Sequence, residues 1–256
     1  MHKRSIFTKF KHHILSNSVF SATEYLSPKE ILFLEEIRKE FDAKYNSFSI
    51  KEKEDFLSEF LIRFTYNSNA IDGNDLSLDD TRKVILQHTF PEKAPKNLID
   101  AHNSKLAFDF LLEYKGKNNK KLMLKLHSIL MDHVNPDAGK LRDHEVEIYG
   151  SYFMPPGAEL VEVELEKIIE SLNESREHVF EKACIFHLRL VSLHPFLEGN
   201  GRIARMLFNY ILWKEGYPMV VFPFARMDSY FNSLEKCHEE DSPRAFITWM
   251  KREYLK

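Results

Sequence analysis

The sequence predicts an all-α protein, and three observations support this class. Of 256 residues only 8 are Gly and 10 are Pro, so the residues that mark β-turns are scarce. Hydrophobic residues make up 43% and charged residues 29%, the balance of a globular chain with a sizeable core. Apolar residues recur at helical spacing in one segment after another. We therefore predict a single multi-helix domain with a small β-hairpin.

The first predicted helices begin with capping sequences. Residues 27–30 read SPKE and residues 49–52 read SIKE, and each pairs an N-cap Ser with a Glu three residues later. The second of these helices is expected to continue to about Ile71, because Gly73 follows and ends it. A shorter helix is expected from Ser77. These elements precede the part of the chain that carries the chemical motifs.

The rest of the chain continues the helical pattern with one interruption. Further helices are predicted at about residues 97–114, 119–134, 160–175, 179–193 and 203–215, with two short ones from about residues 228 and 242. Residues 146–153 read VEIYGSYF between loops rich in Pro and Gly, which predicts the β-hairpin. We expect residues 1–55 to form an N-terminal helical extension and residues 56–256 to form the main domain.

Charge and composition argue against several functional classes. The chain has 36 Lys and Arg against 39 Asp and Glu, a net charge of −3, which gives no support for a nucleic-acid partner. No apolar run approaches the ~18 residues of a membrane span, so no membrane association is expected. Residues 1–22 are basic but lack the apolar stretch of a signal peptide. The two cysteines, Cys184 and Cys237, indicate buried packing residues and a reducing compartment, the cytoplasm.

A backbone pattern suited to anions lies in residues 194–205, which read HPFLEGNGRIAR. The pattern indicates a helix that ends at a His, a short loop, and a turn that starts the next helix. Backbone N–H groups of Gly199, Asn200 and Gly201 would point outward at that helix N-terminus, where free donors and the helix dipole favour an anion. The stretch is not a dinucleotide-binding fingerprint, because a helix and not a strand precedes it.

Four side chains of the same stretch add to this pattern. Arg202 and Arg205 lie three residues apart, on one face of the first turns, where two guanidinium groups could hold a phosphate chain. Glu198 supplies a carboxylate suited to Mg²⁺ that bridges phosphates. His194 is the one side chain there that can accept a proton near neutral pH. Each residue alone also fits an ordinary helix–loop–helix corner, but together they indicate nucleotide phosphate chemistry.

Residues 194–205 resemble the signature of the Fic family, H-P-F-x-[D/E]-G-N-[G/K]-R-x-x-R, and match it at every fixed position. The similarity extends upstream through residues 138–142 and the expected hairpin, and downstream through residues 216–218. It covers roughly residues 60–250. Family members are mostly helical and typically transfer AMP from ATP to a hydroxyl side chain of a target protein. The resemblance therefore implies a protein adenylyltransferase with ATP as substrate and Mg²⁺ as cofactor.

The resemblance also implies a role for each residue of the motif. His194 would be the base that deprotonates a Ser, Thr or Tyr hydroxyl of the target. Glu198 would hold Mg²⁺ on the α- and β-phosphates, and the backbone of residues 199–201 would form the anion hole. Arg202 would contact the β-phosphate and Arg205 the γ-phosphate.

The expected hairpin corresponds to the flap of the family, which pairs its edge with an extended segment of the target. The target-binding flap residues would be Val146, Glu147, Ile148 and Tyr149. The implied partner is a protein that bears a hydroxyl side chain, with the chain itself included as a target. A homodimer is also among the assemblies that the resemblance implies.

A second resemblance lies on the predicted helix near residues 60–73, in the segment SNAIDG that starts at Ser68. It is similar to the autoinhibitory motif of the family, [S/T]-x-x-x-E-[G/N], in which the Glu pairs with the second arginine and blocks the γ-phosphate. The matched positions are Ser68, Asp72 and Gly73, with Asp in place of Glu. Because Asp is shorter by about 1.5 Å, we expect its pair with Arg205 to be loose or water-bridged and the inhibition to be partial. The alternative is an ordinary helix end.

Two further hypotheses remain beside AMP transfer. The same fold could transfer another part of a nucleotide, such as UMP, or remove AMP from a protein by hydrolysis. A noncatalytic domain that binds nucleotides and a protein partner is the third hypothesis. The mass of the intact protein after incubation with each nucleoside triphosphate would separate them.

Overall fold

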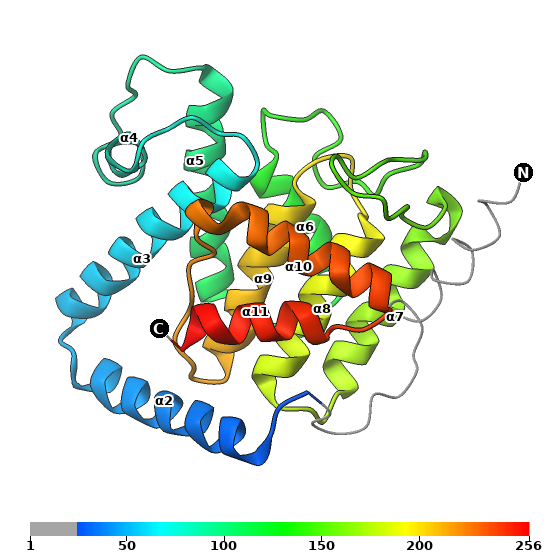
Figure 1. Ribbon diagram of the computed structural model, residues 1–256. Helices are drawn as coiled ribbons and strands as arrows, with labels where there is room; N and C mark the ends of the chain where they lie inside the picture. The colour runs from blue at the N-terminus through cyan, green and yellow to red at the C-terminus, as the bar shows by residue number, and fades with distance from the viewer. Residues whose placement is uncertain (1–24, 256) are drawn as a thin grey trace, which may run out of the picture.

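The computed structural model describes residues 25–255, and all regular structure in this range is helical (Figure 1). The helices are α2 (Pro28–Ser47), α3 (Ile50–Ile71), α4 (Leu78–Arg82), the π-helical turn η1 (Lys83–Gln87), α5 (Pro95–Glu113), α6 (Lys120–Leu130), α7 (Val161–Glu174), α8 (Val179–Leu193), α9 (Asn200–Lys214), α10 (Met227–Glu240) and α11 (Arg244–Tyr254). Short 3₁₀ turns lie at Ala158–Leu160 and Phe224–Arg226. The prediction of an all-α class is confirmed, and the basic residues 1–22 lie outside the described part of the chain.

The predicted caps form as expected. Ser27, Ser49 and Ser77 each accept a hydrogen bond from the backbone N–H three residues later, at 3.3, 3.3 and 3.0 Å. The acidic side chain at that later position bonds back to each Ser, which completes three capping boxes. At its other end α3 closes on Asp72, and Gly73 follows with a φ of 90°. Local sequence thus fixes both ends of the helix that carries the second motif.

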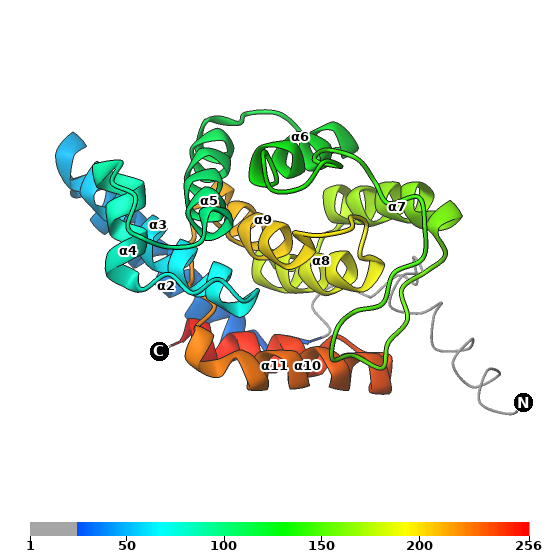
Figure 2. The ribbon, with the colours of Figure 1, turned by 90° about the horizontal axis from the view of Figure 1, so that it is seen from above.

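Helices α8 and α9 form the centre of the molecule. Figure 2 shows α5, α6 and α7 on one side of this pair and α10 and α11 on the other. Every residue of α8 except Lys182 is buried, and α9 is buried from Arg202 to Leu212. A helix that is covered on all sides belongs to the core rather than to the surface. The motif segment therefore joins the two most deeply buried helices.

His187 lies in the aromatic core between α8 and the C-terminal helices. Its ring stacks on Phe222 and Phe246, with centroid distances of 5.4 and 4.7 Å, and its Nε2 lies 3.1 Å from the Tyr230 hydroxyl. Burial lowers the pKa of His187 well below its usual range. This residue therefore packs as a neutral core side chain.

The prediction of a β-hairpin at residues 146–153 is wrong. Residues 142–157, which we call the flap segment, form two extended arms without strand pairing anywhere in the described chain. A tight turn joins the arms, in which Ser151 N–H donates to the Ile148 carbonyl at 3.0 Å and Gly150 has a φ of 76°. Figure 2 shows the segment as a long green loop that reaches α10. Only the turn of the expected hairpin is present.

Side chains take the place of the missing backbone ladder. The guanidinium of Arg142 donates to the carbonyl of Pro156 at 2.5 Å and to the carbonyl of His144 at 3.0 Å. The returning arm contains Pro155 and Pro156, which have no N–H to offer a partner strand. The arms are thus tied at their base by one arginine.

The tip of the flap segment is held by α10. The carboxylate of Glu235 accepts hydrogen bonds from the Ser151 hydroxyl and from the Tyr152 N–H, the latter at 3.2 Å. The ring of Phe153 stacks on His238 of the same helix, with centroids 4.0 Å apart. These contacts fix the flap segment along the edge of α10.

Candidate active site

His194 ends α8 in a left-handed conformation, with φ 50° and ψ 59°. A non-Gly residue rarely adopts such angles, and this one turns the chain sharply toward α9. Its Nδ1 lies 3.3 Å from the Val191 carbonyl, so the hydrogen bond assigns the ring proton to Nδ1 and leaves Nε2 as acceptor. Burial lowers the pKa of His194 from its usual value. The side chain is therefore a neutral proton acceptor at neutral pH.

Asn200 holds the loop that follows His194. Its Oδ1 accepts from the Phe196 N–H at 3.0 Å and its Nδ2 donates to the Phe196 carbonyl at 2.8 Å. The Phe196 ring is fully buried and stacks on His127 at a centroid distance of 3.9 Å. The Asn200 side chain therefore shapes the loop, and only its backbone remains for an anion.

His127 of α6 was not identified from the sequence. Its Nδ1 accepts from the Gly139 N–H at 2.7 Å, so Nε2 carries the proton and lies 3.2 Å from the Glu198 carbonyl. Burial lowers the pKa of His127 to about 4, so the ring is neutral. His127 thereby fixes the backbone at Glu198, and a single His on an amphipathic helix gave no signal of this role.

The predicted anion site lies at the start of α9, which begins three residues earlier than the periodicity indicated. The first helical hydrogen bond runs from Ile203 N–H to the Gly199 carbonyl at 3.0 Å, so the three amides between them precede the ladder. Gly199 has a φ of 82°, and a Cβ there would lie 2.8 Å from the Met131 sulfur. Glycine is required at this position by both its backbone angle and the close contact.

Arg202 is 3% exposed and is surrounded by carboxylates. Asp100 of α5 lies 2.5 Å from the Nη1 atom of Arg202. Glu198 lies 3.4 Å from its Nη2 atom, and Asp72 lies 3.4 Å from its Nε atom. Asp100 is a second residue that the sequence did not reveal, because it is 102 positions away in the chain. A buried arginine with such a partner is held in one orientation.

Arg205 is 1% exposed and is bound by the end of α3. Its Nε donates to the Ser68 hydroxyl at 2.9 Å, and its Nη2 donates to the Ser68 carbonyl at 2.8 Å and to Asp72 Oδ2 at 2.9 Å. The expectation of a loose or water-bridged pair was wrong. The guanidinium folds back onto the last turn of α3, so the shorter carboxylate reaches it directly.

Asp72 also lies over the first turn of α9. A Cβ built on Gly201 would lie 3.3 Å from Asp72 Oδ1, which places this carboxylate beside the amides that begin the helix. A helix N-terminus favours a negative group at that position. The carboxylate of Asp72 therefore occupies space next to the predicted anion site while it pairs with Arg205.

Glu198 is the predicted metal ligand and its side chain is 39% exposed. Burial opposes its ionisation, but the hydrogen bond from Lys96 and the charges of Lys96 and Arg202 outweigh it and lower the pKa of Glu198. The described residues contain no cluster of three potential ligand side chains. Because Mg²⁺ is commonly held by one or two carboxylates together with phosphates, a single ionised Glu beside an anion site fits this cation.

The four predicted target-binding residues lie on the outgoing arm and turn of the flap segment. Tyr149 at the turn is fully exposed, at 105% of the reference area, and Glu147 is also exposed. The base of the segment lies against residues 194–195 of the motif, because Arg142 Nε donates to the His194 carbonyl at 2.8 Å and Arg142 N–H to the Pro195 carbonyl at 3.0 Å. The flap segment therefore starts beside His194.

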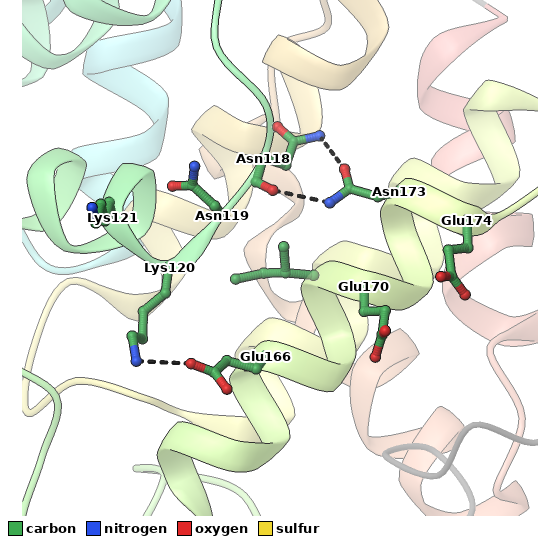
Figure 3. Close-up of a pocket in the computed structure, with 9 residues that line it drawn as sticks. Asn118, Asn119, Lys120, Lys121, Glu166, Glu170, Asn173 and Glu174 are labelled. Atoms are coloured by element: carbon green, nitrogen blue, oxygen red, sulfur yellow. Dashed lines mark hydrogen bonds and ion pairs between the residues drawn. The ribbon is translucent and has the colours of Figure 1, made fainter.

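A separate open groove lies between the start of α6 and α7 (Figure 3). Lys120 pairs there with Glu166 at 2.8 Å, and Asn118 and Asn173 bond to each other. None of the predicted site residues lines this groove. These two pairs link the start of α6 and the residues before it to α7.

The fold and the geometry at the α8–α9 junction define an all-helical domain in which a neutral histidine lies beside the predicted anion site. Residues 118–212 match the family model described as Fic/DOC family, and the chain therefore carries a domain of this family. No helix of the described residues is long and apolar enough to span a membrane.

Several proteins with known names are similar to this chain. The Drosophila erecta protein named Protein adenylyltransferase Fic is 31% identical to this chain over 203 residues. The match covers 75% of this chain and 40% of the relative. The Drosophila ananassae protein of that name is 30% identical over 252 residues, covering 92% of this chain and 50% of the relative. The chain thus spans about half the length of these relatives.

Solved structures share the fold. A fragment of Fic-1 from C. elegans is 27% identical with a TM-score of 0.76, and the match covers 88% of this chain and 68% of that one. A Fic domain containing signaling protein from Bacteroides thetaiotaomicron has a TM-score of 0.78 at 20% identity, covering 88% and 93%. At this lower identity the likeness concerns the fold alone.

Proposed function

We propose that this chain is a protein adenylyltransferase that transfers AMP from ATP to a Ser, Thr or Tyr hydroxyl of a target protein. The observation that carries the proposal is the position of neutral His194 beside the start of α9 and its two buried arginines. The names of the relatives that match most of this chain support the same activity. ATP is the proposed substrate.

The proposed reaction needs one proton acceptor and several groups that stabilise negative charge. His194 Nε2 accepts the proton of the target hydroxyl, whose oxygen attacks the α-phosphorus while the bond to pyrophosphate breaks. Amides of residues 199–201 stabilise the charge on the phosphate oxygens. Arg202 and Arg205 hold the β- and γ-phosphates. Mg²⁺, held by Glu198, would supply further neutralisation of the phosphate charge.

We propose that the end of α3 restrains this activity. Asp72 pairs with Arg205 at 2.9 Å and lies beside the first turn of α9, so it competes with a γ-phosphate for the guanidinium. Ser68 adds two hydrogen bonds that hold Arg205 in the same orientation. Like-charge repulsion between Asp72 and a phosphate adds to the effect. Gly73 permits the turn that follows the helix.

We propose that the flap segment receives the target protein. Val146, Glu147, Ile148 and Tyr149 lie on the arm that starts beside His194, and an extended target segment could pair with this arm by backbone hydrogen bonds. The chain itself is one candidate target, and a homodimer remains a prediction.

Cys184 and Cys237 are buried and free, which accords with the predicted cytoplasmic location.

The dependence of transfer on pH tests the role of His194. The neutral ring is the active form, and the pKa of His194 is lowered, so activity should persist below the usual His value of about 6.5 and fall only at lower pH. We expect the acid limb of kcat/KM to have its midpoint below that value. Because the charge of Asp72 raises the pKa of His194, the midpoint should not move upward in Asp72→Gly. A midpoint above the usual His value in both proteins would contradict the assignment.

Replacing Glu198 with Gln tests the proposed metal ligand. The amide keeps the size of the side chain but removes the charge that a divalent cation requires. We expect the enhancement of nucleotide binding by Mg²⁺ to fall about tenfold or more, which corresponds to roughly 1.4 kcal/mol or more. Calorimetry with ADP, with and without Mg²⁺, measures this enhancement. An unchanged enhancement would remove Glu198 from the metal site.

A further inference from the structure

Lys96 lies at the start of α5 and reaches the catalytic motif. Its Nζ lies 2.9 Å from Glu198 Oε1 and 3.3 Å from Asp100 Oδ2. The Lys96 side chain is 53% exposed, so its ammonium group borders solvent at the mouth of the site. Neither the sequence motifs nor the proposed reaction gives this residue a role.

The carboxylate oxygen that Lys96 contacts is the one that Arg202 also approaches. Arg202 Nη2 lies 3.4 Å from the same Glu198 Oε1, so two cationic groups share one oxygen. Arg202 is buried and held by Asp100, whereas Lys96 is half exposed and has a flexible stem. Of the two cations, Lys96 is the one that can leave without the loss of a buried charge pair.

We propose that Lys96 is an internal cation that competes with the divalent metal ion for Glu198 and so sets the metal affinity of the site. This inference rests on the proposed metal role of Glu198. An ammonium group is a compact, strongly hydrated point charge, and it lies where a cation bound to Glu198 Oε1 would lie. A metal ion that binds with nucleotide must therefore displace Lys96. The released amino group retains Asp100 and solvent as partners.

The test measures how strongly Mg²⁺ enhances ADP binding. ADP affinity is determined by calorimetry with and without Mg²⁺ for the wild type and for Lys96→Met, and the two affinities are expressed as a ratio. In this ratio the effect of any direct contact between Lys96 and phosphate cancels, because such a contact changes the ADP affinity equally with and without Mg²⁺. We expect the ratio to rise roughly fivefold in Lys96→Met, as for the loss of a partly exposed ion pair.

Lys93→Met is the matched control. Lys93 lies three residues away, and its Nζ is 3.9 Å from Asp75 Oδ2 rather than near Glu198. We expect its ratio to equal that of the wild type.

Three results would overturn the proposal. An unchanged ratio in Lys96→Met, with the enhancement lost in Glu198→Gln, would refute competition by Lys96 and leave the metal site intact. Equal losses of ADP affinity with and without Mg²⁺ would make Lys96 a phosphate ligand instead. Full enhancement in Glu198→Gln would refute the metal role of Glu198 and the inference with it.

Discussion

Replacing His194 with Ala is expected to lower the rate of AMP transfer by about 10²–10⁴-fold, the usual contribution of a positioned general base. The Nε2 atom of His194 is the proposed proton acceptor, whereas both ring nitrogens of the other neutral histidine at this site, His127, are engaged by the backbone of Gly139 and Glu198. Nucleotide binding should change little, because the ring acts on the attacking hydroxyl and not on the phosphates. The effect should therefore appear in kcat.

This prediction is checked by measuring transfer rates and ATP affinity on the same preparations. His133→Ala is the control, since His133 is largely exposed and its ring lies against Asp132, outside the site. It should retain wild-type rates. Full transfer activity in His194→Ala would remove this residue from the role of base.

Replacing Asp72 with Gly is expected to raise the rate of transfer about tenfold to a hundredfold. The change removes the carboxylate from Arg205 and from the first turn of α9, so the guanidinium becomes available to the γ-phosphate. A hydrogen bond to a charged group contributes about 1.5–3 kcal/mol, which corresponds to this range of rates. Arg205 keeps its two bonds to Ser68, so the change removes only the part of the restraint that comes from Asp72.

Two conservative variants separate the charge of Asp72 from its shape. Asp72→Asn keeps the size of the side chain and an acceptor oxygen but loses the charge, so its rate should lie between those of the wild type and Asp72→Gly. Asp72→Glu should stay as slow as the wild type or slower, because the carboxylate still reaches Arg205. Equal self-modification rates in wild type, Asp72→Gly and Asp72→Glu would leave Asp72 as an ordinary helix-end residue.

The helices and the motif could be predicted because their signals are local. Capping boxes at Ser27, Ser49 and Ser77 fix helix starts within four residues of sequence. The twelve residues from His194 to Arg205 lie on one helix end, one loop and one helix start, so their spacing alone brings them together. Local geometry of this kind does not depend on how distant helices pack.

The contacts that hold the motif in place could not be predicted, because they join distant parts of the chain. Asp100 and Arg202 are 102 positions apart, and His127 reaches Glu198 across 71 positions. The hairpin failed for a related reason. Its alternating apolar pattern was real, but Arg142 and two prolines favour arms tied by side chains over a backbone ladder.

The direct contact between Asp72 and Arg205 also depends on packing. Side-chain length alone predicted a loose pair, since Asp is one methylene shorter than Glu. The docking of α3 brings Ser68 within 2.9 Å of the Arg205 guanidinium, and this draws the arginine toward Asp72. The packing of the C-terminal half of α3 against α9 decided the outcome, and that packing is a property of the whole core.

The most direct test of AMP transfer uses ATP labelled at either its α- or its γ-phosphate. Asp72→Gly and the double variant Asp72→Gly/His194→Ala are incubated with each form and Mg²⁺, alone and with cell extract, and with α-labelled UTP for comparison. Labelled protein is then detected on a gel. We predict label from the α-phosphate of ATP in the single variant, none from the γ-phosphate, and none in the double variant. Label from the γ-phosphate, stronger label from UTP than from ATP, or label that persists without His194 would contradict the account.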